Sequence, residues 1–224
     1  MTNHQVSLLR LMQLVSPTLP IGAFAYSQGQ EYAIDRGWLK TAAQVEDWIG
    51  GILHRGIGRL DAPVLLRLHR AWTDGNEADV WYWNKYLLAS REARELLDED
   101  LQVGRALAIL LDSLEVPGAA PWRDQEPSLA CQFALAASHW GIPAEQTLLG
   151  YLWSWCENQI AAASKTLPLG QTDAQRILQR LLQQIPQVVN HALALSDADI
   201  GGSLPGVAIA SAYHETQYSR LFRS

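Results

Sequence analysis

The feature that most constrains the fold is a long apolar stripe in the second half of the chain, after Pro143. Apolar side chains return there at the three- and four-residue spacing of one helical face, and Gln159 is the single polar exception. The stripe consists of Leu148, Leu149, Leu152, Trp155, Cys156, Gln159, Ile160 and Ala163. A helix with so continuous an apolar face has to bury it against other elements, so we expect this helix in the core.

The helical period continues through almost the whole chain, and no segment shows the sustained two-residue alternation of a strand. Expected helices cover residues 5–15, 24–36, 41–55, 61–72, 77–114 with a break near Ser90, 128–140, 143–165, 172–192 with a kink at Pro186, and 207–213. Thr41 and Thr172 each begin a capping-box pattern. The predicted fold class is all-α: a single helical-bundle domain of about eight to ten helices at residues 1–200, with a flexible C-terminal tail at 201–224 that belongs to the same domain. A loop rich in proline and glycine at 116–127 could separate two halves.

Composition bounds the class of protein. In 224 residues, 48% hydrophobic and 18% charged side chains can fill a sizeable core. The net charge of -6 argues against nucleic acid or an anionic membrane as the main partner. The first ten residues lack a cationic signal region, and the longest clean apolar run, at 106–111, is too short to cross a bilayer, so we expect a cytoplasmic protein. Its two cysteines lie in helical, apolar surroundings, which favours reduced core thiols.

The usual catalytic signatures are missing. The chain contains no phosphate-binding P-loop, no glycine-rich dinucleotide fingerprint after a strand and no Gly-x-Ser-x-Gly. Six histidines and two cysteines show no His-x-x-x-His or Cys-x-x-Cys spacing, so we expect no stable metal site, no cofactor and no enzymatic activity. Transient passage of a metal ion along oxygen and imidazole groups would leave no motif and stays open.

A segment at residues 16–31 gathers prolines, glycines and aromatics between two expected helices. Its simplest interpretation is a tight turn from helix to helix. The alternative is a partner-binding rim, because polar and aromatic side chains are gathered there as they are at interfaces. The candidate partner-binding residues in this region are Tyr26, Ser27, Gln28, Glu31 and the nearby Tyr32.

Charged residues offer two further candidates. Lys165 ends the long helix, where a cation either complements the helix dipole or is presented to a partner. In the run at 91–100, the spacing pairs Arg91 with Glu95 and Arg94 with Asp98, which is typical of a solvated helix face and could also form an acidic docking face.

The last eleven residues, 214–224, form no amphipathic pattern that could bury itself, yet they carry two aromatics and two arginines. Aromatic and arginine side chains are common anchors of interfaces. The tail and the segment at 16–31 together therefore indicate an adaptor rather than an enzyme. The tail residues predicted to bind a partner are Gln217, Tyr218, Arg220, Leu221 and Phe222.

Three separate segments, in order along almost the whole chain, together resemble the UreF family of urease accessory proteins. They are Leu19-Pro20-Ile21-Gly22-Ala23-Phe24-Ala25-Tyr26-Ser27-Gln28-Gly29-Gln30-Glu31, the stretch from Tyr151-Leu152-Trp153-Ser154-Trp155 through Lys165 to Pro168-Leu169-Gly170-Gln171-Thr172-Asp173, and the tail at 214–224. The chain departs from the family pattern at Gln30, in place of leucine, and at Ala212-Tyr213, in place of a basic residue near His214.

The resemblance implies an all-helical homodimer that binds the accessory protein UreD (UreH in some bacteria) through its tail. It further implies recruitment of the nickel-binding GTPase UreG and docking on apo-urease, so that nickel released on GTP hydrolysis reaches the urease active site. By the same resemblance, the tail residues Tyr218, Arg220, Leu221 and Phe222 would meet UreD, and Tyr32 and Lys165 would lie on faces exposed to partners.

Two other functions compete with this adaptor role. In one, Lys165 or an exposed arginine acts on the UreG GTPase in trans, as an arginine finger would. In the other, the chain is a general helical interaction domain with no metal role. Single-turnover GTP hydrolysis would separate the first from a scaffold, because a finger raises the rate by orders of magnitude.

Overall fold

The computed structural model describes residues 2–224, and every regular element in that range is helical. The α-helices are α1 (Thr2–Leu14), α2 (Gln30–Asp35), α3 (Ala42–Ile52), α4 (Asp61–Asp74), α5 (Glu77–Ala89), α6 (Arg94–Ser113), α7 (Leu129–His139), α8 (Ala144–Thr166), α9 (Gln171–Leu182), α10 (Ile185–Ala194) and α11 (Pro205–His214). Shorter turns of helix are η1 (Ala23–Ala25), η2 (Leu53–Ile57), η3 (Ala120–Asp124) and η4 (Asp197–Asp199). The predicted all-α class is confirmed, and the described residues form a single helical domain.

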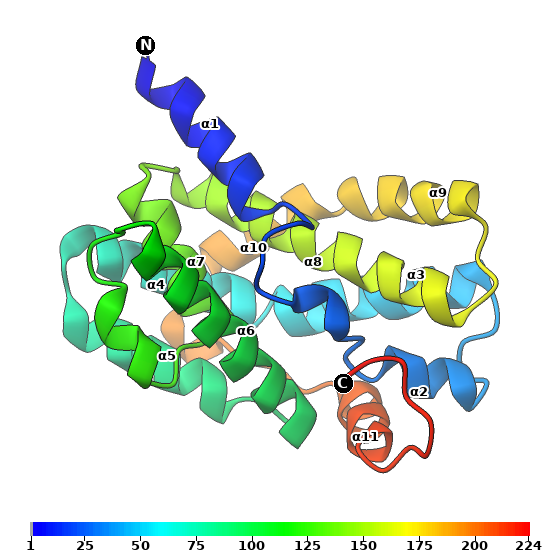
Figure 1. The fold of residues 1–224 in the computed structure, drawn as a ribbon. Helices are drawn as coiled ribbons and strands as arrows, with labels where there is room; N and C mark the ends of the chain where they lie inside the picture. Colours follow the sequence, from blue (N-terminus) through cyan, green and yellow to red (C-terminus); the bar gives the residue numbers. More distant parts are fainter. Residues whose placement is uncertain (1) are drawn as a thin grey trace.

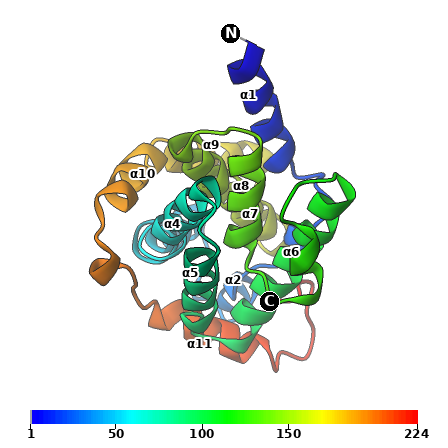
Figure 2. The same cartoon turned by 90° about the vertical axis from the view of Figure 1, so that its left-hand side faces the viewer.

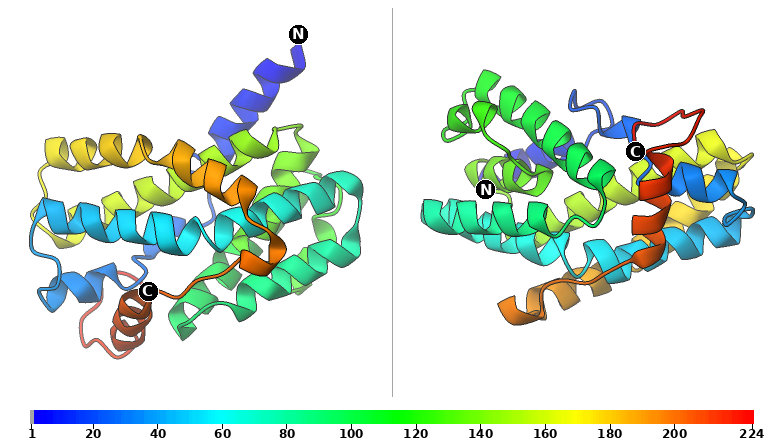
Figure 3. Two further views of the ribbon diagram at one scale, coloured as in Figure 1. Left: turned by 180° about the vertical axis from the view of Figure 1, so that it is seen from behind. Right: turned by 90° about the horizontal axis from the view of Figure 1, so that it is seen from below.

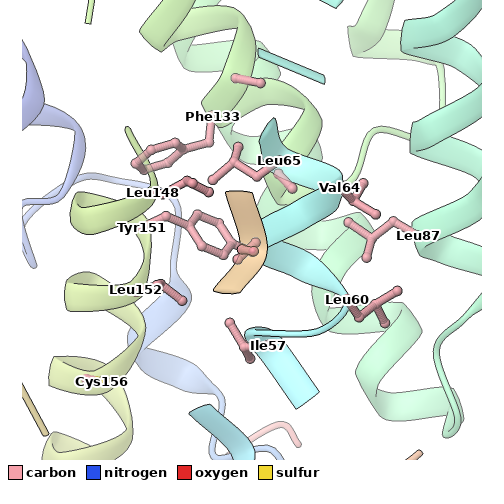
Figure 4. Packing of buried hydrophobic residues seen from close by; sticks show 14 of the residues in the cluster. Ile57, Leu60, Val64, Leu65, Leu87, Phe133, Leu148, Tyr151, Leu152 and Cys156 are labelled. Carbon is pink, nitrogen blue, oxygen red and sulfur yellow. The ribbon is translucent and has the colours of Figure 1, made fainter. Parts of the chain in front are cut away.

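Helix α8 runs through the middle of the domain, with α2, α4, α7, α9 and α10 packed around it (Figures 1 and 2). Its predicted apolar stripe is the buried face: Leu148, Leu152, Cys156 and Gln159 are fully buried. Figure 4 shows Leu148, Tyr151 and Leu152 pointing from α8 into the core. Each fully buried leucine contributes on the order of 2 kcal/mol of transfer free energy.

Helices α4 and α7 pack closely against each other and against α8. Small side chains on α7 allow the close approach, since Ala130, Ala134 and Ala136 are fully buried. On α6, Gly104 meets the start of α7 so closely that a Cβ there would lie 2.1 Å from the Pro127 carbonyl oxygen. Both cysteines are free and buried, as expected of core thiols.

The loop at 116–127 belongs to the core and does not separate two halves. It contains η3, whose Trp122 is only 3% exposed and stacks on Trp81 of α5 at a centroid distance of 4.4 Å. Trp72 of α4 contacts the same ring edge to face at 6.2 Å. The loop packs on α4, α5 and α6, and α7, which follows it, packs on α4 and α6, so the elements before and after the loop stay in one domain.

The single helix expected at residues 24–36 is wrong. The chain makes the short turn η1, breaks, and begins α2 only at Gln30. The break occurs because Gln28 and Gly29 take positive φ angles of 55° and 77°, which a helix does not accommodate. At Gly29 the backbone of α11 is so near that a Cβ would lie 2.7 Å from the Ser211 nitrogen.

Other helix boundaries show where local patterns succeed and fail. The Thr41 cap is confirmed, since its side chain accepts a hydrogen bond from the Gln44 nitrogen, and the expected break near Ser90 separates α5 from α6. The predicted cap at Thr172 is wrong: α9 already begins at Gln171 after Gly170. Pro186 does not kink one helix; it lies in the first turn of a new helix, α10, where its missing N–H costs nothing.

The two ends of the chain lie on different sides of the domain. Helix α1 projects from the body in Figures 1 and 2 and in the left view of Figure 3, while α11 lies on the opposite side and packs on α2 and α6. The short helix expected near 207–213 is confirmed by α11. Within residues 2–224, no helix is long and apolar enough to cross a membrane.

Candidate functional site

The last ten residues, 215–224, hereafter the tail, fold back onto the domain beside α2 and the break that precedes it (Figures 1 and 3). The backbone nitrogen and the hydroxyl of Ser27 both donate to the backbone oxygen of Ser224, each at 2.6 Å. The Arg223 nitrogen donates to the Ala25 oxygen at 2.8 Å. The expectation of a flexible tail is therefore not supported, because the backbone broken at 25–29 leaves polar groups that the tail satisfies.

Glu31 binds the backbone of the tail through its carboxylate. Its two carboxylate oxygens accept hydrogen bonds from the Leu221 nitrogen at 2.7 Å and the Phe222 nitrogen at 2.9 Å. The Nε2 atom of His214 also lies 3.1 Å from this carboxylate. Glu31 is 8% exposed, so it belongs to the interior of the site rather than to an outer rim as predicted.

Glu95 of α6 forms the other wall of the site. One of its oxygens lies 2.8 Å from Nδ1 of His214, and the other accepts a hydrogen bond from Arg220 at 2.9 Å. Burial raises the pKa of the Glu95 carboxyl, His214 and Arg220 act to lower it, and the neighbouring Glu215 adds to the rise. A carboxylate in this position holds both the end of α11 and the tail.

The predicted pairing of Arg91 with Glu95 is wrong. Arg91 instead forms ion pairs with Asp61 of α4 at 2.6 Å and with Asp100 of α6 at 2.7 Å, and both acids are buried. This leaves Glu95 free for the tail. The run at 91–100 is therefore only partly the solvated face expected from its charges.

The second predicted pair, Arg94 with Asp98, is present at 2.9 Å on the exposed side of α6. A surface pair of this kind contributes only about 0.5 kcal/mol.

Lys165 links the end of α8 to both other predicted segments. Its ammonium lies 5.5 Å from the ring centroid of Phe222 in the tail and 5.9 Å from that of Phe24 in η1. Phe222 is 5% exposed, whereas Phe24 is 62% exposed. The three segments singled out in the sequence thus meet at one place on the surface, where Lys165 itself is exposed.

The predicted aromatic residues of the rim are buried. Tyr26 is 4% exposed and its hydroxyl donates to the Gln102 side chain at 2.8 Å. Tyr32 is 8% exposed because Tyr213 stacks on it at 5.5 Å and Trp38 meets it edge to face at 5.7 Å. The expectation that Tyr32 lies on an exposed face is therefore wrong for this chain by itself, and its contact with a partner stays a prediction.

Gln28 is half-buried and bridges two elements. Its amide nitrogen donates to Glu99 of α6 at 2.9 Å, and its amide oxygen accepts from the Trp155 indole of α8 at 2.9 Å. Glu99 also accepts a hydrogen bond from the Ser224 hydroxyl at 3.1 Å. Burial raises the pKa of Glu99 to about 7 against the lowering effect of these hydrogen bonds.

Among the predicted tail residues, two side chains point outward. Tyr218 is fully exposed and Leu221 is 63% exposed. Gln217 is half-buried and donates to the Ser219 oxygen at 2.9 Å, which shapes the turn that presents Tyr218. Anchored backbone with outward apolar side chains is an arrangement that can bind another protein.

A cavity of about 260 Å³ lies between the break before α2, α6 and α8. Its walls are mostly apolar, and its polar lining includes Gln28, Asp61, Arg91, Glu99, Asp100 and Asn158. Among the described residues, no group of three or more histidine, cysteine, aspartate or glutamate side chains is arranged to hold a metal ion.

Sequence reasoning missed His214, Glu95 and Phe24 as parts of the site. A signal for His214 was present, because the buried face of α11 repeats at helical spacing and reaches it: Val207, Ala210, Ser211, His214. For Glu95 and Phe24 the neighbours come from segments far away in the chain, and no local pattern indicates them.

Comparison with known proteins gives a consistent result. Residues 39–182 match the UreF family model. The chain is 55% identical over 219 residues to the urease accessory protein UreF of Hahella chejuensis, covering 98% of this chain and 99% of that protein. It is 51% identical to the UreF of Alkalilimnicola ehrlichii over 100% of this chain and 98% of that protein, and 52% identical to that of Teredinibacter turnerae over 97% and 98%. The chain belongs to the UreF family of urease accessory proteins.

Proposed function

We propose that this chain is a non-catalytic adaptor of urease maturation that bridges the nickel-binding GTPase UreG to UreD (UreH in some bacteria) and apo-urease. It works in the cytoplasm as a homodimer and supports GTP-dependent nickel insertion. Membership of the urease accessory family supports the general role. The specific bridging is the proposal.

The observation that carries the proposal is the anchored tail with two outward side chains. Glu31 fixes the backbone of Leu221 and Phe222, so Tyr218 and the Leu221 side chain are presented without a large loss of conformational entropy on binding. Aromatic anchors held in this way typically dominate the affinity of an interface. We propose UreD as the partner of this surface, because the resemblance to the UreF family implies that the tail meets UreD.

The test is co-purification of UreD with variants of the full chain. Tyr218→Ala and Leu221→Ala remove exposed side chains, so the fold is expected to stay intact while affinity for UreD falls by about 2 kcal/mol for the stronger of the two. Tyr82→Ala is the matched control, because Tyr82 is 57% exposed on α5. UreD binding that survives the double tail variant at normal stoichiometry contradicts the proposal.

A second function concerns regulation of the GTPase, and one observation favours it. Lys165 is exposed, and the rings of Phe24 and Phe222 hold its ammonium in place at the surface. A fixed cation of this kind could act on a phosphate in trans. Single-turnover GTP hydrolysis by UreG, measured with and without the chain, decides between the adaptor role and regulation of the GTPase. A rate that rises by orders of magnitude, and that Lys165→Ala returns to the basal value, supports regulation. An unchanged rate supports the adaptor.

The proposal assigns no resident cofactor to the chain, and nickel is cargo of the assembly. The His214 cluster supports this assignment. Its ring nitrogens face Glu31 and Glu95 on opposite sides, so one ion cannot bind the imidazole and both carboxylates together.

A further inference from the structure

Two glutamines, Gln30 of α2 and Gln159 of α8, meet in the core where these helices pack, and both are 0% exposed. The side-chain nitrogen of Gln30 donates to the backbone oxygen of Gln159 at 2.9 Å. The side-chain oxygen of Gln30 and both polar atoms of the Gln159 amide have no hydrogen-bond partner among residues 2–224. The contact between α2 and α8 therefore buries polar atoms whose hydrogen bonds the protein does not supply.

The contact of α2 with α11 contains another such residue. At Gly29, just before α2, a Cβ would lie 2.7 Å from the Ser211 nitrogen, so the two backbones are in direct contact. Ser211 is fully buried, and its hydroxyl has no partner among the described residues. A buried polar group without a partner costs free energy that is recovered when the group returns to water. Opening of α2 is thus less costly than it would be from an entirely apolar contact.

Helix α2 is also short and is separated from its neighbours along the chain. It has 6 residues, Gln30–Asp35, and two of the residues that it buries, Gln30 and Glu31, are polar. Gly29 and Gly37, on either side of the helix, take positive φ angles of 77° and 72°. These turns interrupt the helical backbone. An element with few apolar contacts and such boundaries can open while the rest of the domain stays folded.

The tail depends on α2 through Glu31. The carboxylate of Glu31 accepts hydrogen bonds from the backbone nitrogens of Leu221 and Phe222. When α2 leaves α8, Glu31 moves with it, and both tail nitrogens lose their acceptor. Opening of α2 therefore exposes these two tail amides to solvent.

We propose that α2 opens locally from α8 and α11 while the other helices stay folded, and that each opening releases the backbone of the tail at Leu221 and Phe222. Gln30 favours the open state, because its buried oxygen gains a hydrogen bond with water there. The buried apolar contacts of Tyr32 and Ala33 keep the closed state the more populated one. This inference concerns the free chain and does not rest on the adaptor role.

The experiment is amide hydrogen exchange by NMR on the full chain, at one pH and at increasing urea concentrations below the unfolding transition. The reporters of α2 are the amides of Ala33 and Arg36, which donate to the backbone oxygens of Gly29 at 3.1 Å and Tyr32 at 2.9 Å. Leu152, fully buried in α8, reports on the core.

In the wild type we expect the protection factors of Ala33 and Arg36 to be at least about tenfold lower than that of Leu152. Their dependence on urea should also be weaker, because a local opening exposes less surface than global unfolding. Leu221 and Phe222 should be protected no more than Ala33, since every opening of α2 exposes them.

The variant Gln30→Met tests the role of the glutamine, because methionine has a similar length and carries no unpaired oxygen. The protection factors of Ala33 and Arg36 are expected to rise about three- to tenfold, which is the balance between the unpaired oxygen removed and the one hydrogen bond lost. Gln183→Met is the matched control: Gln183 is exposed at the end of α9, and the protection of α2 should not change.

Three outcomes overturn the proposal. Ala33 and Arg36 can exchange with the rate and the urea dependence of Leu152, which means that α2 opens only in global unfolding. Leu221 or Phe222 can be better protected than Ala33, which means that the tail stays bound when α2 opens. In Gln30→Met the protection of α2 can stay the same or fall, which means that this glutamine does not favour opening. Should Gln30→Met fail to fold, the two wild-type comparisons still decide.

Discussion

The ammonium of Lys165 lies 5.5 Å from the ring centroid of Phe222, so the end of α8 and the tail share a direct contact. Phe222 is 5% exposed and Lys165 lies above it at the surface. The sequence leaves two roles open for this lysine, as a charge that complements the helix dipole or as a charge for a partner. The structure adds a third, since the cation also covers a buried aromatic ring of the tail.

Lys165→Ala is predicted to affect assembly with UreG more than folding. The loss of an exposed cation–π contact and of the dipole interaction costs about 1 kcal/mol, so the melting temperature stays within a few degrees of wild type. Binding to UreD stays intact, and UreG coupling or nickel insertion weakens. Lys85→Ala is the matched control, because Lys85 makes a similar contact with Trp81 at 5.9 Å on α5. The prediction is contradicted if urease reaches its normal activity and nickel content, at the normal rate, with the Lys165 variant. Lys165 then only complements the dipole at the end of α8.

The isolated chain is predicted to bind no nickel ion tightly. Within residues 2–224 no cluster of potential ligands is arranged around a common point. Equilibrium dialysis of the purified chain checks this. One ion bound stoichiometrically at submicromolar affinity, and lost on replacing a single histidine or cysteine, would contradict it.

Helical periodicity was sufficient to predict the fold class, the central position of α8 and most helix boundaries, because burial of an apolar face is a local property of the sequence. It failed at residues 24–36, where two positive φ angles at Gln28 and Gly29 break the helix. That break depends on the close approach of α11, which lies far away in the chain. The contacts between the tail and the domain were not predicted for the same reason: they are hydrogen bonds to Glu31 and Ser27, which no periodicity reveals.

Glu99→Gln is predicted to stabilise the protein at neutral pH. Burial raises the pKa of Glu99 from 4.5 to about 7 in the folded state, so its contribution to stability is fully present below pH 4.5 and is lost as the pH rises to about 7. A glutamine avoids that loss, and its amide can still accept from Gln28 while the Ser224 hydroxyl turns to accept from it.

Because Glu99 is half-buried, the expected gain above pH 7 is limited to about 1 to 2 kcal/mol. Urea unfolding at about pH 5 and about pH 8 measures it, and the difference between variant and wild type should appear mainly at the higher pH. An equal effect at both pH values would show that packing rather than ionisation is responsible. Glu92→Gln, at an exposed position just before α6, is the control.

Gly29→Ala is predicted to disturb the position of the tail while the rest of the domain stays folded. Gly29 has a φ of 77° and a new Cβ would lie 2.7 Å from the Ser211 nitrogen and 3.0 Å from the Ala210 Cβ, so neither the backbone nor α11 can accommodate it. Together the strained φ and the displaced helix cost about 2 to 4 kcal/mol.

Gly51→Ala is the matched control, since Gly51 lies inside α3 with open space around it and alanine there is expected to stabilise the helix by about 0.5 to 1 kcal/mol. Denaturant unfolding and UreD binding are measured on both variants. We expect Gly29→Ala to bind UreD weakly under conditions where the chain is still folded. The reason is that the tail follows α11, so a displaced α11 moves Arg220 away from Glu95 and Phe222 away from Glu31. If Gly29→Ala binds UreD as the wild type does, the packing of α2 against α11 does not position the tail.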